Sequence, residues 1–170
     1  WITDGTVLGT KLLKEINPGL TGGGSNPKGF TKLSNGKVIF QADDGINGIE
    51  LWITDGTFAG TTTLKNIRPG YVGSNPQGFT ELGDGKVVFR ADNGYSGTEL
   101  WVTDGTSIGT TPIIAISGID TDNFRLLDDG KMLFQANDGI HGFELWVTDG
   151  TSAGTKLLKD INSGVNGSYP

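Results

Sequence analysis

A six-residue phrase that recurs four times constrains this chain more than any other feature of its sequence. It reads Trp-Ile-Thr-Asp-Gly-Thr in the first two copies and Trp-Val-Thr-Asp-Gly-Thr in the last two, and Gly-Thr follows two residues later. The copies begin at Trp1, Trp52, Trp101 and Trp146, which are 51, 49 and 45 residues apart. A period of this length predicts a series of equivalent structural units.

Each unit alternates apolar and polar residues between turn signals, which is the pattern of half-buried strands. In the first complete unit we expect strands at about 29–33, 37–43, 49–54 and 61–67, separated by glycine-containing turns. The 29 glycines and the hydrophobic content of only 35% also favour short strands over helices. Four short antiparallel strands in such a unit are typical of a β-propeller blade.

We therefore expect an all-β fold of tandem four-stranded antiparallel sheets, equivalent to about three and a half propeller blades. Residues 1–27 would form the second half of a blade and a crossover, residues 28–76 and 77–122 one blade each, and residues 123–170 a blade and a crossover. A closed propeller needs about four to eight blades. The ring could be completed by the remainder of a longer chain or by self-association of several copies, or the units could form an open stack.

Neighbouring units must cover each other's faces, because one sheet of this size buries too little apolar surface to be stable alone. Two series of phenylalanines recur at equivalent positions, and we expect both in the core between blades. They are Phe30, Phe79 and Phe124 in one series, and Phe40, Phe89 and Phe134 in the other.

Composition excludes several classes of function. The chain has no cysteine, so it has no disulfide, thiolate metal site or cysteine nucleophile. Its net charge of −6 and its dispersed lysines and arginines argue against nucleic acid as a partner. No apolar stretch approaches the length of a membrane-spanning helix.

The extended phrase Glu-Leu-Trp-x-Thr-Asp-Gly-Thr, at residues 50–57, 99–106 and 144–151, resembles the ELWxxDGT repeat family. Its members occur in large secreted or surface bacterial proteins, some of them called hyalin-like. The resemblance covers essentially the whole chain and implies an exported, repeat-built bacterial protein, secreted or at the cell surface. Residues 117–123 depart from the repeat, because they replace the Pro-Gly and Ser-Asn-Pro crossover of the other units.

The turn between the second and third strands carries the clearest candidate chemistry. Oxygen ligands in a glycine-containing turn suit Ca²⁺, although the spacing is not that of an EF-hand. The alternative is that Asp and Asn bond to nearby backbone N–H groups and only shape the turn. The candidate calcium ligands are Asp43, Asp44, Asn47 and Glu50, then Asp92, Asn93 and Glu99, and finally Asn137, Asp138 and Glu144.

Three other residue types could have a functional role, but for each of them a purely structural role is the alternative. The aspartates of the Asp-Gly-Thr phrase could act in acid–base chemistry, but identical repetition favours a turn-forming role. The tryptophans could stack on sugars, but their strand positions favour packing against the adjoining blade. His141 is the only histidine, and a polar turn residue is its expected role.

These features favour a non-enzymatic repeat scaffold or binding module that contacts a protein or a glycan. Repetition on a rigid frame suits polyvalent contact. One alternative is a lectin with one shallow sugar site per blade. The other is an enzyme whose catalytic residues lie outside this segment.

Overall fold

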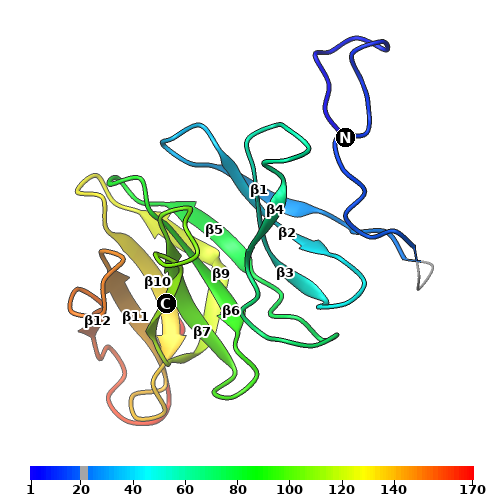
Figure 1. Cartoon of the computed structure of the whole chain (residues 1–170). Coiled ribbons are helices and arrows are strands. Elements are labelled where there is room, and N and C mark those ends of the chain that lie inside the picture. Colours follow the sequence, from blue (N-terminus) through cyan, green and yellow to red (C-terminus); the bar gives the residue numbers. More distant parts are fainter. Residues whose placement is uncertain (20–22) are drawn as a thin grey trace.

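The computed structural model describes residues 1–19 and 23–170, and these residues form twelve strands and no α-helix (Figure 1). The first sheet contains β1 (Lys28–Lys32), β2 (Val38–Asp43), β3 (Ile49–Thr54) and β4 (Thr62–Lys65). The second contains β5 (Gln77–Glu81), β6 (Val87–Asp92), β7 (Thr98–Thr103) and β8 (Thr111–Ile114). The third contains β9 (Ser117–Leu126), β10 (Met132–Asn137), β11 (Phe143–Thr148) and β12 (Lys156–Lys159).

Each sheet pairs its four strands in chain order, and all of these pairings are antiparallel. The predicted all-β class and the four-stranded units are confirmed, and each predicted strand of the first unit lies within two residues of an observed one. The described sheets do not close into a ring, so the propeller stays a proposal. No helix in the described residues is long and apolar enough to cross a membrane.

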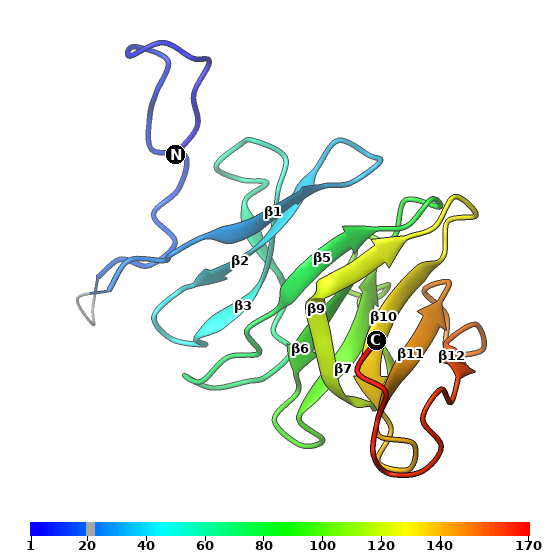
Figure 2. The same ribbon diagram turned by 180° about the vertical axis from the view of Figure 1, so that it is seen from behind.

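The three sheets lie face against face along the molecule, as the two opposite views show (Figures 1 and 2). The core between the first and second sheets joins Ile39, Leu51 and Ile53 to Phe89 and Trp101, among others. The core between the second and third sheets repeats this arrangement with the equivalent residues. The second sheet therefore covers one face of the first sheet, and the third sheet covers the equivalent face of the second.

The two phenylalanine series follow this packing with one exception. Phe40, Phe89 and Phe134 are buried, Phe124 is buried and Phe79 packs against the first core. The expectation that Phe30 is also buried is wrong, since its side chain is 63% exposed. Phe30 lies on the face of the first sheet that no complete sheet covers, and its ring stacks on that of Phe40.

The first 19 residues form half of a unit beside the first sheet. A single antiparallel bridge joins Ile2 to Lys11, where the complete units have two paired strands. The Lys14 ammonium donates to the Phe58 carbonyl at 3.4 Å, as the Lys65 ammonium donates to the equivalent Ser107 carbonyl at 3.0 Å one unit later. Lys14 also donates to the Thr61 carbonyl at 2.6 Å. This half-unit therefore contacts the first sheet much as the first sheet contacts the second. The expected crossover at residues 20–22 lies outside the described residues.

The third sheet begins differently from the first two. Ser117 pairs with Asn137 and Asp120 with Gln135, so the segment that replaces the usual crossover is itself part of β9. The boundary drawn between residues 122 and 123 falls inside this strand. Only Ala115 and Ile116 separate β8 from β9.

Candidate functional site

In the β2–β3 turn, the side chains of the calcium candidates accept hydrogen bonds from the turn's own backbone. Asp43 Oδ1 accepts from the Gly45 N–H at 2.7 Å, and Asp44 Oδ1 accepts from Ile46 at 2.9 Å and Asn47 at 2.7 Å. Asn47 Nδ2 donates to Asp44 Oδ2 at 2.8 Å. Burial raises the pKa of Asp44, but the bonds from Asn47 and Ile46 outweigh it and keep the pKa below its ordinary value.

The other two turns repeat this geometry. Asn93 Oδ1 accepts from the Tyr95 and Ser96 N–H groups, and Asp138 Oδ1 accepts from Ile140 and His141. His141 Nδ1 lies 2.7 Å from Asp138 Oδ2, and this contact raises the pKa of His141. His141 is thus a polar turn residue, as the sequence predicts.

Glu50 has a different role from the turn aspartates, and sequence reasoning missed it. Its carboxylate is buried and accepts the N–H groups of Ile67 at 2.8 Å, Arg68 at 2.9 Å and Ser74 at 3.1 Å. The Ser74 hydroxyl donates a fourth bond at 2.7 Å. We call the segment between β4 and β5, residues 66–76, the first crossover. Glu50 joins both ends of the first crossover to β3.

Glu144 makes the same four contacts in the last unit. Its acceptors bond to the N–H groups of Ile161, Asn162 and Ser168, and to the Ser168 hydroxyl at 2.6 Å. Burial raises the pKa of Glu50 above its ordinary value. At Glu144 burial acts in the same direction, but the bonds from Ser168 and the backbone outweigh it and lower the pKa. Both side chains are almost completely inaccessible to solvent.

Glu99 lacks this arrangement because its unit lacks the crossover. Its carboxylate accepts instead from Asn93 Nδ2 at 2.9 Å and from Ser96 Oγ at 2.5 Å, both in its own turn. The repeated Glu of the sequence phrase therefore binds the downstream segment wherever a serine lies 24 residues after it, at Ser74 and Ser168. That pairing of Glu with a downstream Ser is the sequence signal that could have revealed the role.

Two glycines let the turn approach the crossover closely. A Cβ on Gly48, which has φ of 69°, would lie 2.5 Å from the Tyr71 carbonyl oxygen, and one on Gly142 would lie 2.3 Å from the Gly167 nitrogen. The equivalent Gly97 also has a positive φ but meets nothing within 4 Å. Gly48 and Gly142 are thus required for contact as well as for turn conformation.

The described residues contain no group of three or more His, Cys, Asp or Glu side chains arranged to hold a metal ion. The candidate ligands divide between two tasks, since the turn Asp and Asn face their own backbone while Glu50 and Glu144 face a crossover. A calcium site stays a prediction, and the geometry supports the turn-forming alternative.

The Asp-Gly-Thr loops have the same hydrogen bonds in all four units. In the second loop, Asp55 Oδ1 accepts from the Thr57 N–H and hydroxyl, and the Thr57 hydroxyl in turn accepts from the Gly60 N–H. The distance from the aspartate oxygen to the threonine hydroxyl is 2.7 Å in the first three loops and 2.6 Å in the last. These bonds, with the threonine hydroxyl first, lower the pKa of each aspartate.

The tryptophans of the complete units are buried against the preceding unit, as the packing interpretation predicts. Trp101 lies in the core shared with the first sheet and Trp146 in the core shared with the second. Trp52 packs with Phe40 and Ile16 of the half-unit. Trp1 is the exception at 80% exposed, because no sheet precedes it in the described residues.

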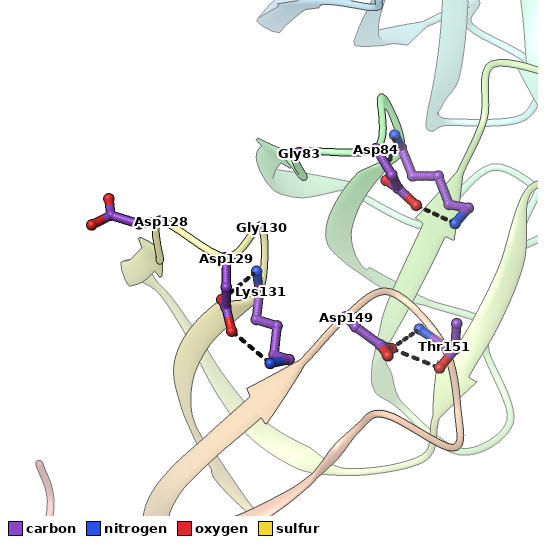
Figure 3. Close-up of a pocket in the computed structure, with 9 residues that line it drawn as sticks. Gly83, Asp84, Asp128, Asp129, Gly130, Lys131, Asp149 and Thr151 are labelled. Atoms are coloured by element: carbon purple, nitrogen blue, oxygen red, sulfur yellow. Dashed lines mark hydrogen bonds and ion pairs between the residues drawn. The ribbon is translucent and has the colours of Figure 1, made fainter.

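An open polar groove of about 600 Å³ lies between the hairpin turns of the second and third sheets (Figure 3). Lys86 pairs with Asp84 and Lys131 with Asp129, while Asp149 bonds to Thr151. Asp128 points away from the other labelled side chains (Figure 3). Four aspartates against two lysines leave the groove acidic, and it can offer carboxylates and ammonium groups to hydroxyl groups of a ligand.

A scan of known protein-family models and a search of curated proteins each return no match to this chain.

Proposed function

We propose that this chain is a non-enzymatic repeat scaffold that presents equivalent loops to a protein or glycan partner. The observation that carries the proposal is the near-identical bonding of the four Asp-Gly-Thr loops, whose aspartate–threonine distances agree within 0.1 Å. A catalytic site needs a unique set of groups, whereas a network present in every unit serves the fold of every unit. Equivalent loops on rigid sheets favour polyvalent contact.

The same proposal includes propeller-type blades and export from a bacterial cell. The face-to-face stacking of the sheets supports the first part, together with the neighbouring positions of β1, β5 and β9, the first strand of each sheet. The resemblance of residues 50–57 and their two repeats to the ELWxxDGT family supports the second part.

A glycan array combined with product analysis tests this function. We expect the chain to retain a subset of array glycans or of surface proteins and to return a bound glycan chemically unchanged, whereas about one glycan site per repeat would support the lectin alternative. A pull-down with bacterial surface proteins covers the protein partner. Release of a cleaved glycan would contradict the scaffold proposal.

A lectin is the second candidate, and the acidic groove of Figure 3 favours it. Sugar hydroxyl groups can bond to Asp84 and Asp129 there, although no aromatic ring lines the groove for stacking. Asp84→Asn combined with Asp129→Asn would then weaken binding of an array hit about tenfold, because hydrogen bonds to charged groups are the stronger ones. Asp128→Asn is the matched control. Equal affinity of all three proteins would argue against this site.

A further inference from the structure

One face of the third sheet exposes apolar side chains that are buried in the other two sheets. We call this face the tail; it includes Leu127, Leu158 and Ile161, which are 36%, 51% and 52% exposed. Leu127 is equivalent to Leu33 and Leu82, because all three donate their N–H to the lysine that closes the same hairpin turn. Leu33 and Leu82 are both 2% exposed.

The sheet that follows is what buries these positions elsewhere in the chain. Leu33, Leu64 and Ile67 belong to the core that contains Phe89 and Trp101 of the second sheet. Leu82, Ile113 and Ile116 belong to the core that contains Phe134 and Trp146 of the third. The first and second sheets each have a face equivalent to the tail, and in both cases that face packs against the phenylalanines and tryptophan of the sheet that follows.

The opposite end of the molecule exposes a member of the tryptophan series. We call this end the head; it includes Trp1 and Leu12 of the half-unit, which are 80% and 48% exposed. Trp1 is the counterpart of Trp101 and Trp146, which lie in the cores shared with the preceding sheet. Leu12 is the counterpart of Leu157, which packs against the preceding sheet's core.

We propose that the tail of one copy of this chain docks on the head of a second copy. The contact continues a packing arrangement that the chain already makes twice internally, with the same residue types on each side. Such a contact is heterologous, so each copy keeps one free tail and one free head and the assembly grows as a chain or closes as a ring. This inference concerns the end faces, and it does not depend on the scaffold proposal.

Two complementary variants test the proposal by analytical ultracentrifugation of the whole chain. The tail variant carries Leu158→Glu and Ile161→Glu, and the head variant carries Trp1→Glu and Leu12→Glu. These side chains are about half exposed or more, so the fold tolerates the changes. Each variant alone should associate at least about 100-fold more weakly than the unmodified chain, because each variant loses two buried apolar side chains and each of these contributes at least about a factor of ten.

Ultracentrifugation of an equimolar mixture of the two variants tests whether the tail binds the head. The head variant keeps an intact tail and the tail variant keeps an intact head, so the mixture should form a one-to-one dimer and nothing larger. Tyr95→Glu with Ile108→Glu, at exposed positions away from both ends, is the control that should associate like the unmodified chain. A chain that stays monomeric at about 1 mM, or a mixture that stays monomeric while the unmodified chain associates, would overturn the proposal.

Discussion

The Glu50 carboxylate accepts the Ser74 hydroxyl at 2.7 Å, and this bond joins β3 to the segment that leads into the second sheet. Two backbone N–H groups at the start of the crossover and that of Ser74 complete the coordination of the carboxylate. The path of the crossover is therefore set by one buried side chain from a strand. The first two predictions follow from this arrangement.

Glu50→Ala should destabilise the protein far more than Glu99→Ala. Truncating Glu50 leaves the backbone donors of Ile67, Arg68 and Ser74 without their acceptor, for which we expect a loss of about 3 kcal/mol. Among the described residues, Glu99 accepts hydrogen bonds from Asn93 and Ser96 of its own turn, so its removal should cost about 1 kcal/mol. Urea denaturation measures both values, and Glu144→Ala should resemble Glu50→Ala. Equal losses for Glu50→Ala and Glu99→Ala would refute the assigned role.

Gly48→Ala and Gly97→Ala separate close contact from turn conformation. Both glycines have positive φ, so both alanines should cost about 1–2 kcal/mol for the left-handed conformation. Only at Gly48 does the added Cβ meet the crossover backbone, and there we expect a further loss of about 1–3 kcal/mol. Thermal and urea unfolding of the two variants give the difference. Matching stabilities would mean that the crossover can move aside freely.

Phe89→Ala should cost about 3–5 kcal/mol, because its ring is fully buried between the first two sheets and its loss leaves a cavity. Phe30→Ala, at the same kind of sheet face but mostly exposed, should cost less than about 1 kcal/mol. The free energy of unfolding at low protein concentration checks both, since dilution keeps the end faces of separate copies apart. A large loss at Phe30 would show that its face is covered within one chain.

Acid should lower the melting temperature through the Asp-Gly-Thr loops. The pKa of Asp104 is held below its ordinary value of 3.8, first by the Thr106 hydroxyl. Its contribution to stability is therefore complete above pH 3.8 and is lost as the pH falls through the folded-state pKa. Glu50 acts in the opposite sense, since its raised pKa gives stability that is complete below pH 4.5 and is lost as the pH rises through the folded-state value.

With four such aspartates against one Glu50, we expect a net fall in melting temperature below pH 3.8. Asp104→Asn should make that fall shallower, because the amide cannot titrate. A melting temperature that rises as the pH drops through this range would contradict the assignment.

Calcium should leave the melting temperature unchanged, since the turn Asp and Asn oxygens already accept backbone hydrogen bonds. Calorimetric scans with excess Ca²⁺ and with excess chelator make the comparison. A stabilisation by Ca²⁺ that Asp44→Asn removes would instead establish the metal site, because binding to the folded state alone raises its stability.

The strands were predictable because local chemistry defines them. Alternation from Val38 to Asp43 and the glycines at 45 and 48 fix both the strand and its turn without reference to the rest of the chain. The role of Glu50 was not predictable in the same way, because its partners are 17 to 24 residues away and its position beside Asp44 suggested a turn ligand. Pairing across that distance depends on the path of the backbone.

The exposure of Phe30 was missed for a related reason. The repeat makes Phe30 equivalent to Phe79 and Phe124, and sequence equivalence carries no information about which unit stands at an end of the array. Burial of that position is a property of the neighbouring sheet, so it changes where the neighbour is only half present.

Unfolding cooperativity should be unevenly distributed because β9 replaces a crossover. Only two residues separate β8 from β9, so the second and third sheets cannot move far apart unless β8 or β9 leaves its own sheet. The first sheet is joined to the second through residues 66–76, and loss of the Glu50 contacts would release that connection. In an array of repeats each unit is stabilised mainly by its neighbours. We therefore expect the first sheet to open before the other two, which should unfold together.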